Sequence, residues 1–148
     1  MNYINIRIGK DLSGMDREFR RAISDIFRMA NPMFTIGQHA WIPHTDIFET
    51  AGEIVVTSEL AGVNVEDIHV DTDRRTLKIY GVRREMARHD DGRYLLAEIP
   101  SGYFERIISL SYPIDTETVT ASYSEGLLQI SLKKLPVDQI HNIAVRCI

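Results

Sequence analysis

Cysteine is almost absent from this chain, which has a single one, Cys147, among its 148 residues. A lone cysteine cannot close an intramolecular disulfide, and this fits a reducing compartment. Its thiol is either an incidental feature of the chain's end or an intermolecular redox link. We therefore expect a cytoplasmic protein.

Long apolar runs and basic runs are also missing. The longest apolar stretches fall far below the roughly 20 residues that span a bilayer, and no charged start leads into an apolar stretch and a cleavage site. Lys and Arg number 17 against 21 Asp and Glu, which gives a net charge of -4. Such a balance does not attract a phosphate backbone. We expect a soluble protein with no transmembrane segment, no secretory signal and no nucleic acid partner.

The usual signatures of catalytic and cofactor sites are absent as well. There is no Gly-x-Ser-x-Gly elbow and no phosphate-cradling glycine loop. Glu98 and Glu105 could be paired carboxylates, but ion pairing is the simpler expectation. The stretch His89-Asp90-Asp91 could bind a metal with Glu85, or could be a solvated loop tip. The histidines lack zinc-site spacing and are expected on the surface or in loops: His39, His44, His69, His89 and His141. We expect no enzyme activity, no metal and no cofactor.

The hydrophobic pattern divides the chain into three regions, at residues 1–40, 41–134 and 135–148. In the first, Ser13-Gly-Met-Asp16 is similar to a capping box and predicts a helix start, and Pro32 marks the helix end. Apolar residues at three- and four-residue steps make this helix amphipathic: Met15, Phe19, Ala22, Ile23, Ile26, Phe27 and Ala30. Ahead of it, Ile4, Ile6 and Ile8 alternate with polar residues as in a short strand.

From Trp41 onward the apolar period changes to two, which predicts half-buried strands. Many short strands without long helices between them indicate an antiparallel sandwich. Glu125-Gly126 supplies the turn of the last hairpin, because glycine can take a positive φ. The segment from Arg83 to Ser101 is too long for a hairpin turn. The alternating residues are Ile54, Val56 and Leu60; Ile68 and Val70; Leu77 and Ile79; Phe104, Ile108 and Leu110; Val119, Ala121 and Tyr123; and Leu128, Ile130 and Leu132.

Several motifs follow one another in a characteristic order. These are Pro43, Asp46 and Glu49; Leu60-Ala-Gly62-Val63; Leu77-Lys-Ile79-Tyr-Gly81; Glu98 with Gly102-Tyr-Phe104-Glu-Arg106; the hairpin from Ala121 to Lys134; and Ile143-Ala-Val145. In order and spacing they resemble the small heat shock proteins of the Hsp20/α-crystallin family. Three positions depart from family prolines, namely Ala61, Ser111 and Lys133, and none is a core position.

This resemblance implies an all-β fold: an immunoglobulin-like antiparallel β-sandwich, the α-crystallin domain, with a helical N-terminal extension and an extended C-terminal tail. It implies a strand-swapped dimer whose interface includes Tyr94, Leu96, Glu98 and Arg106. It also implies that Ile143 and Val145 anchor the tail in a groove on a neighbouring subunit, lined by Ile68, Val70, Val119 and Ala121. Alternatively, the tail folds back on its own domain.

Two other segments could compete for this groove. Leu135 and Val137 form a second candidate plug, although they sit close to the last strand. Ile4, Ile6 and Ile8 share the alternate spacing, or else form a strand or arm that never binds there.

The N-terminal helix and the residues after it offer flexible and aromatic apolar surface that could bind varied unfolded chains. The alternative is packing between subunits. The candidate client-binding residues are Met15, Phe19, Ile23, Ile26, Phe27, Met33 and Phe34.

The function that this resemblance implies is an ATP-independent holdase chaperone. It would bind partly unfolded client proteins, assemble with itself into dimers and larger oligomers, and pass clients to ATP-driven refolding chaperones. The alternative function is a co-chaperone or scaffold adaptor that binds one defined folded partner.

Overall fold

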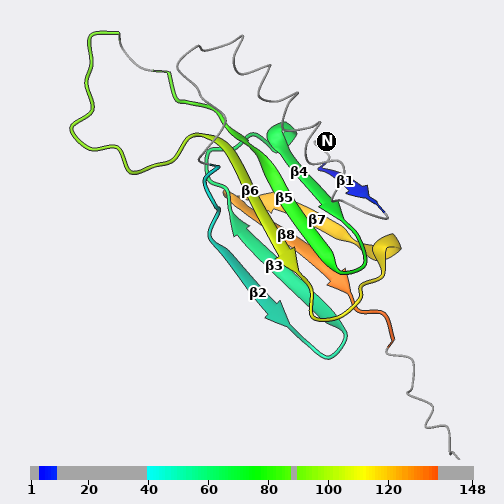
Figure 1. The fold of residues 1–148 in the computed structure, drawn as a ribbon. Coiled ribbons are helices and arrows are strands. Elements are labelled where there is room, and N and C mark those ends of the chain that lie inside the picture. Colours follow the sequence, from blue (N-terminus) through cyan, green and yellow to red (C-terminus); the bar gives the residue numbers. More distant parts are fainter. Residues whose placement is uncertain (1–3, 10–39, 88–89, 137–148) are drawn as a thin grey trace, which may run out of the picture.

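A computed structural model describes residues 4–9, 40–87 and 90–136, which form two four-stranded sheets packed face to face (Figure 1). Sheet A has the order β1 (Asn5–Ile8), β4 (Ile68–Thr72), β5 (Thr76–Arg83) and β6 (Gly102–Ser109). Sheet B has the order β2 (Thr45–Glu49), β3 (Glu53–Glu59), β8 (Leu127–Lys133) and β7 (Thr120–Ser124). Two short 3-10 helices, η1 (Val65–Asp67) and η2 (Thr116–Thr118), precede β4 and β7. The expected all-β sandwich is confirmed.

The core lies between the sheets because each strand turns alternate side chains inward. Sheet B contributes Val56 and Ile130, and sheet A contributes Val70, Ile79 and Phe104, all with no exposed surface. Leu60 is equally buried although it follows the last residue of β3, and Leu110 is buried just beyond β6. The apolar alternation in the sequence therefore predicts core residues correctly even where they lie just beyond the ends of the strands.

The β7–β8 hairpin turns at Glu125 and Gly126, as expected. Their φ angles are 53° and 82°, and positive φ at both central residues is the mark of a tight hairpin whose twist matches its strands. The Leu60 amide donates to the Gly126 carbonyl over 2.7 Å. The hairpin tip is thereby fastened to the turn that follows β3.

The sandwich includes one strand from the first region of the chain. β1 lies parallel to β4, whereas every other pair of strands is antiparallel. At the opposite edge of sheet A, the Trp41 amide donates to the Tyr103 carbonyl over 3.2 Å, and Trp41 packs against the core. The chain from residue 9 to residue 40 thus connects the two edges of the same sheet. The helix expected between Ser13 and Pro32 lies outside the described residues.

Gly81 is a strand glycine that the packing requires. A Cβ built on it would lie 1.9 Å from the Asp67 carbonyl oxygen and 2.9 Å from Phe104 Cζ. The first of these atoms belongs to the backbone of the segment that leads into β4, so it cannot move aside without shifting that strand. Gly52, in the turn between β2 and β3, has nothing within 4 Å of its ideal Cβ.

We expect Gly81→Ala to destabilise the fold by about 3 kcal/mol or more, since overpacking against rigid neighbours costs about 1–3 kcal/mol and here the obstacle is backbone. Gly52→Ala is the control and should stay within about 0.5 kcal/mol of the parent protein. Urea unfolding followed by circular dichroism measures both. Equal midpoints for the two variants would show that Gly81 is not needed for close packing.

Candidate assembly groove and loop edge

The four residues predicted to receive the tail lie on one side of the sandwich. Ile68 and Val70 point inward from β4 and are fully buried. Ala121 lies on β7, the outer strand of sheet B, and Val119 just before it; both pack against the core while remaining partly accessible. The structure therefore brings these residues to the side where the edges of the two sheets meet. That they receive the tail stays a prediction.

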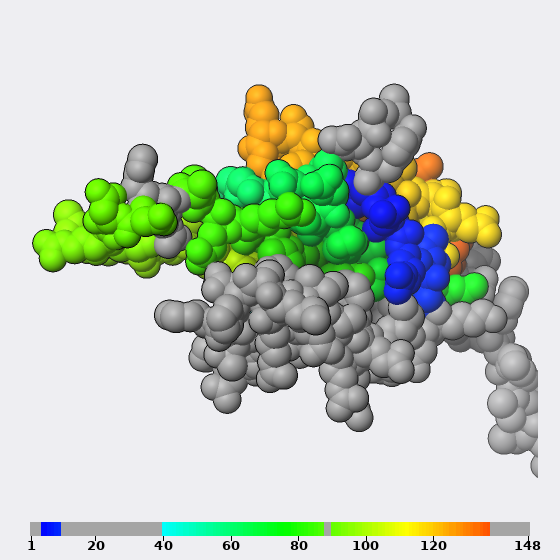
Figure 2. Space-filling view, turned by 90° about the horizontal axis from the view of Figure 1, so that it is seen from above, coloured from blue at the N-terminus to red at the C-terminus, as the bar shows by residue number. Residues whose placement is uncertain are grey.

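β1 lies along this side of the sandwich. Its parallel register sets Ile6 opposite Val70 and Arg7 opposite Asp71, and the Gly9 amide donates to the Thr72 carbonyl over 3.1 Å. Ile4 and Ile6 pack against the core, whereas Ile8 is 52% exposed. Figure 2 shows the blue residues of β1 between the green residues of sheet A and the yellow residues around η2. The expected short strand is confirmed, and it lies beside the residues predicted to line the groove. That it competes with the tail stays a prediction.

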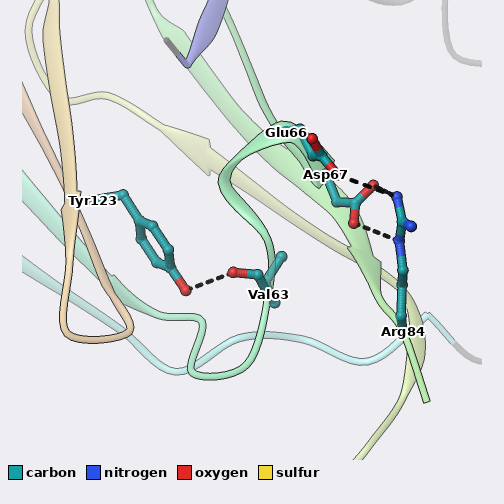
Figure 3. A network of polar contacts seen from close by, with 5 residues as sticks. All are labelled: Val63, Glu66, Asp67, Arg84 and Tyr123. Carbon is teal, nitrogen blue, oxygen red and sulfur yellow. Dashed lines mark hydrogen bonds and ion pairs between the residues drawn. The ribbon is translucent and has the colours of Figure 1, made fainter. Parts of the chain in front are cut away.

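A cavity of about 520 Å³ continues the groove beyond Ile4. The Tyr123 hydroxyl closes the side toward η1, where it lies 2.8 Å from the Leu60 carbonyl and 2.9 Å from the Val63 carbonyl, to either of which it can donate (Figure 3). Burial raises the pKa of Tyr123. The residues that line the cavity are Ile4, Val63, Asn64, Val65, Ala121, Ser122 and Tyr123.

Arg84 ties the start of the long loop to η1. Its Nε and Nη2 atoms each lie 2.8 Å from one oxygen of Asp67, a bidentate pair that Figure 3 shows, and Glu66 lies 3.7 Å away. The hydrogen bonds that Arg84 donates to the Asp67 carboxylate raise the pKa of Arg84. The guanidinium is well exposed, so this pair orients the loop more than it stabilises the fold.

Arg83 joins both ends of the same loop to Trp41. Its guanidinium lies 4.1 Å from the centre of the Trp41 ring, and its Nη1 donates to the Pro100 carbonyl over 2.9 Å. Burial lowers the pKa of Arg83, and its buried Nε atom has no hydrogen-bond acceptor among the described residues. Sequence reasoning missed this residue, because the single signal was a pair of arginines at the end of an apolar strand.

The long loop projects away from the sandwich (Figure 1). Its described residues, 84–87 and 90–101, form no strand within this chain, and Tyr94, Leu96 and Glu98 are exposed. Arg106 shares the inward side of β6 with Phe104 and Ile108, as expected from its place in the alternation. Among the described contacts none joins Arg106 to the loop residues, so the predicted dimer interface is not assembled within one chain.

β2 is an open edge of sheet B. Within the described ranges it pairs with β3 on one side only, and its Ile47 and Phe48 side chains are both more than half exposed. The sequence analysis quoted Asp46 and Glu49 as part of a motif but did not identify this strand. The signal that could have identified it is an apolar pair in a strand with no apolar alternation of its own.

Among the acidic residues and histidines singled out in the sequence, one expectation is confirmed and one is corrected. Glu105 forms an ion pair with Lys78 at 3.3 Å, as the ion-pairing expectation had it, while Glu98 has no such partner among the described contacts. His69 is not a loop histidine: it is half-buried on β4, stacked on Tyr80 with ring centres 5.3 Å apart. Within the described ranges, no group of acidic, histidine or cysteine residues could hold a metal ion, and no helix is long and apolar enough to cross a membrane.

The comparisons with known proteins agree with this architecture. The model of the Hsp20/alpha crystallin family matches residues 46–146. The chain belongs to this family. Small heat shock protein C2 of Rickettsia felis is 32% identical over 105 residues, which are 71% of this chain and 68% of that protein. A second Rickettsia felis relative, small heat shock protein C4, is 36% identical over a segment that spans only 56% of its own length.

Solved structures of the family superpose on the sandwich. Heat shock protein 16.0 of Schizosaccharomyces pombe has a TM-score of 0.60 at 29% identity, covering 72% of this chain and 99% of that one. The hspA protein of Xanthomonas axonopodis also has a TM-score of 0.60 at 29% identity, covering 68% and 100%. A small heat-shock protein from Xylella fastidiosa, described as having a distinct high order structure, has a TM-score of 0.59 at 29% identity, covering 74% and 100%.

Ile143, Val145 and the candidate client-binding residues Met15, Phe19, Ile23, Ile26, Phe27, Met33 and Phe34 lie outside the described residues, so their roles stay predictions. Leu135 is described, and its amide donates to the Pro113 carbonyl of its own sandwich over 2.8 Å. Leu135 is therefore attached to its own sandwich, and the roles of Leu135 and Val137 as a second plug stay a prediction.

His69, on β4, makes the stability of the fold depend on pH. Burial lowers its pKa from 6.5, against the opposing effect of Asp71 and Asp67, and Arg7 lowers it further. As the pH falls below 6.5, the unfolded chain therefore binds a proton at His69 before the folded chain does. This contribution destabilises the fold progressively until the pH passes the folded pKa.

We expect His69→Gln to flatten the fall in unfolding free energy between about pH 7 and pH 5, relative to the parent protein. His44→Gln, at an exposed histidine, is the control. Urea titrations at several pH values give the slope, which separates this effect from any loss of the ring contact with Tyr80. A slope equal to that of the parent protein would contradict a lowered pKa at His69.

Proposed function

We propose that this protein is an ATP-independent holdase chaperone that binds partly unfolded proteins as a dynamic oligomer of dimers. The observation that carries the proposal is the family sandwich, in a chain whose tail holds a pair of branched residues, Ile143 and Val145, two positions apart. Aggregation depends steeply on the concentration of exposed apolar chains, so sequestration alone slows it. No energy source is needed for that step.

In the dimer, the long loop of each subunit pairs with the β2 edge of its partner. The loop presents apolar side chains to solvent, among them Leu95 at 89% exposure, and the β2 edge of sheet B is unpaired. A segment from Tyr94 to Ile99 that added to the β2 edge of a partner would pair both backbones and bury Phe48 together with its own apolar residues. Arg106, on the neighbouring edge strand, is then available to a carboxylate or carbonyl of the incoming loop.

Tail contacts join the dimers. Burying Ile143 and Val145 contributes about 1.5–3 kcal/mol each, and ordering the spacer from Pro136 to Asn142 opposes this at about 1 kcal/mol or more for each backbone residue that is fixed. A single contact is therefore weak. Several tails in one closed assembly raise one another's effective concentration, so the oligomer persists while individual contacts open and subunits exchange.

Client capture belongs to the N-terminal region. Methionine and phenylalanine on one helical face give an apolar surface that adapts to unrelated sequences. In an oligomer that loosens, the same surface can pack between subunits at one time and bind clients at another. ATP-driven refolding chaperones of the cytoplasm would then receive the clients.

We expect Ile143→Asp with Val145→Asp to leave folded dimers and remove the larger oligomer, because two carboxylates in an apolar slot have no partner there. The matched control, Asn142→Asp with Ala144→Asp, adds the same number of carboxylates on the other side of the extended segment. Light scattering after size exclusion gives the masses. An unchanged oligomer mass in the first variant would remove this tail as the assembly anchor.

We expect Phe19→Ser with Phe27→Ser to reduce protection of a heated client several-fold in an aggregation assay without ATP, since both residues lie on the apolar face of the predicted helix. Arg17→Ser with Arg21→Ser, on the polar face, is the control. Circular dichroism verifies that each variant keeps its strands. Full protection by the phenylalanine variant would move capture onto the sandwich, and a parent protein that protects no client would favour the adaptor alternative.

A further inference from the structure

The groove that is proposed to receive the tail is already filled by the chain's own N-terminal segment. Ile6 stands opposite Val70 in the β1–β4 register, and Ile4 lines the same cavity as Ala121. Both isoleucines pack against the core cluster that contains Ile68. β1 thus supplies two branched aliphatic side chains, two residues apart, to the place where the anchor requires them.

The two ends of the chain carry the same short pattern. The N-terminal segment has the sequence Ile4-Asn-Ile6-Arg7-Ile8, and the tail has the sequence Ile143-Ala-Val145-Arg146-Cys147. Each reads isoleucine, any residue, a branched aliphatic residue, arginine and an apolar residue. Two segments that share side-chain spacing and charge can pair with the same strand edge in the same register.

The shared arginine sets a positive charge opposite an aspartate in this register. Arg7 stands opposite Asp71, and its charge is one of those that act on His69. Asp71 is 5% exposed and accepts a hydrogen bond from the Tyr80 hydroxyl at 3.2 Å. A strand that docks parallel to β4 with its isoleucine in the place of Ile4 would bring Arg146 to the same aspartate.

We propose that β1 is an internal copy of the tail anchor: it occupies the groove within its own subunit and must leave before the Ile143–Cys147 segment of a neighbour can bind there. The proposal rests on the groove's role in the proposed function and specifies how that role is regulated. The incoming tail takes the parallel register of β1, with Ile143, Val145 and Arg146 in the places of Ile4, Ile6 and Arg7. The occupant and the competitor have the same chemistry, so neither end excludes the other permanently.

β1 has the features of an occupant that can be displaced. It has four residues, it pairs through one edge only, and its pairing is parallel, which is slightly weaker per residue than antiparallel pairing. Its third isoleucine, Ile8, is half exposed. When an internal segment fills a site in about nine of ten molecules, the apparent Kd of a competing ligand rises about tenfold.

A labelled peptide with the sequence of Leu135 to Ile148 tests the competition. The host is the full chain carrying Ile143→Asp and Val145→Asp, so that its own tail cannot compete. Into this host we would introduce Ile4→Asp with Ile6→Asp, which drives β1 from the groove. Fluorescence anisotropy should then show the peptide binding about tenfold more tightly than to the host with an unaltered β1.

Two controls keep this test specific. Asn5→Asp with Ile8→Asp places two carboxylates on the same strand at exposed positions and should leave the Kd unchanged, as should the conservative change of Ile4 and Ile6 to Val. Circular dichroism and urea unfolding verify that every host is folded. A peptide with Arg146→Glu should bind the opened groove about tenfold more weakly, and equal binding would overturn the shared register.

The outcomes separate this inference from the proposed function. Equal peptide affinity for hosts with and without β1 in place would overturn the competition and leave the tail's role intact. No binding to either folded host would overturn both, because the groove would then not be the receptacle of the tail. Tighter binding on displacement of β1, absent from the exposed-position control, supports the inference.

Discussion

A β-sandwich leaves a row of backbone N–H and C=O groups without partners along each outer strand, and such rows attract other strands. The edges of this sandwich meet that constraint differently. In sheet A, β1 covers β4 and a single residue, Trp41, bridges to β6; in sheet B, neither β2 nor β7 has a second partner strand among the described residues. The assembly that we propose uses these edges, and the two packed sheet faces hold them in place.

The fastening of the loop follows from the same constraint. In the dimer that we propose, the loop must not pair with its own subunit, yet it must leave the sandwich in a defined direction. Arg83 and Arg84 supply this at the loop's base, one by its contacts with Trp41 and Pro100, the other by its pair with Asp67. The base is fixed by polar contacts while the apolar residues beyond it remain available.

Much of this fold was open to prediction because alternation is a local property. The alternation of neighbouring residues was enough to assign Val56, Val70 and Ile130 to the core. The pair Glu125-Gly126 predicted a turn, and both residues have a positive φ. The groove residues followed from the alternation combined with the family resemblance. Gly81 was quoted as part of a motif, but its function in packing depends on the approach of the Asp67 carbonyl, which belongs to η1, ahead of the neighbouring strand β4.

What could not be predicted depends on partners that are remote in sequence. The alternation of Ile4, Ile6 and Ile8 predicts a strand but does not say which edge it joins or in which direction, and a parallel pairing with β4 has no local signal. The stacking of His69 on Tyr80 and of Arg83 over Trp41 arises only when separate strands are brought together. Polar side chains that appear to alternate outward on a strand can still be half-buried.

The attachment points of the N-terminal region bear on its reach. The Gly9 amide donates to Thr72 at one edge of sheet A, and the Trp41 amide donates to Tyr103 at the other, so the chain is attached to the sandwich on both sides of residues 10–40. In the proposed exchange, a subunit whose β1 leaves β4 keeps the attachment at Trp41 and loses the one at Gly9. A tail that binds in one groove would thereby lengthen the reach of the apolar residues that precede Trp41 in the subunit that received it.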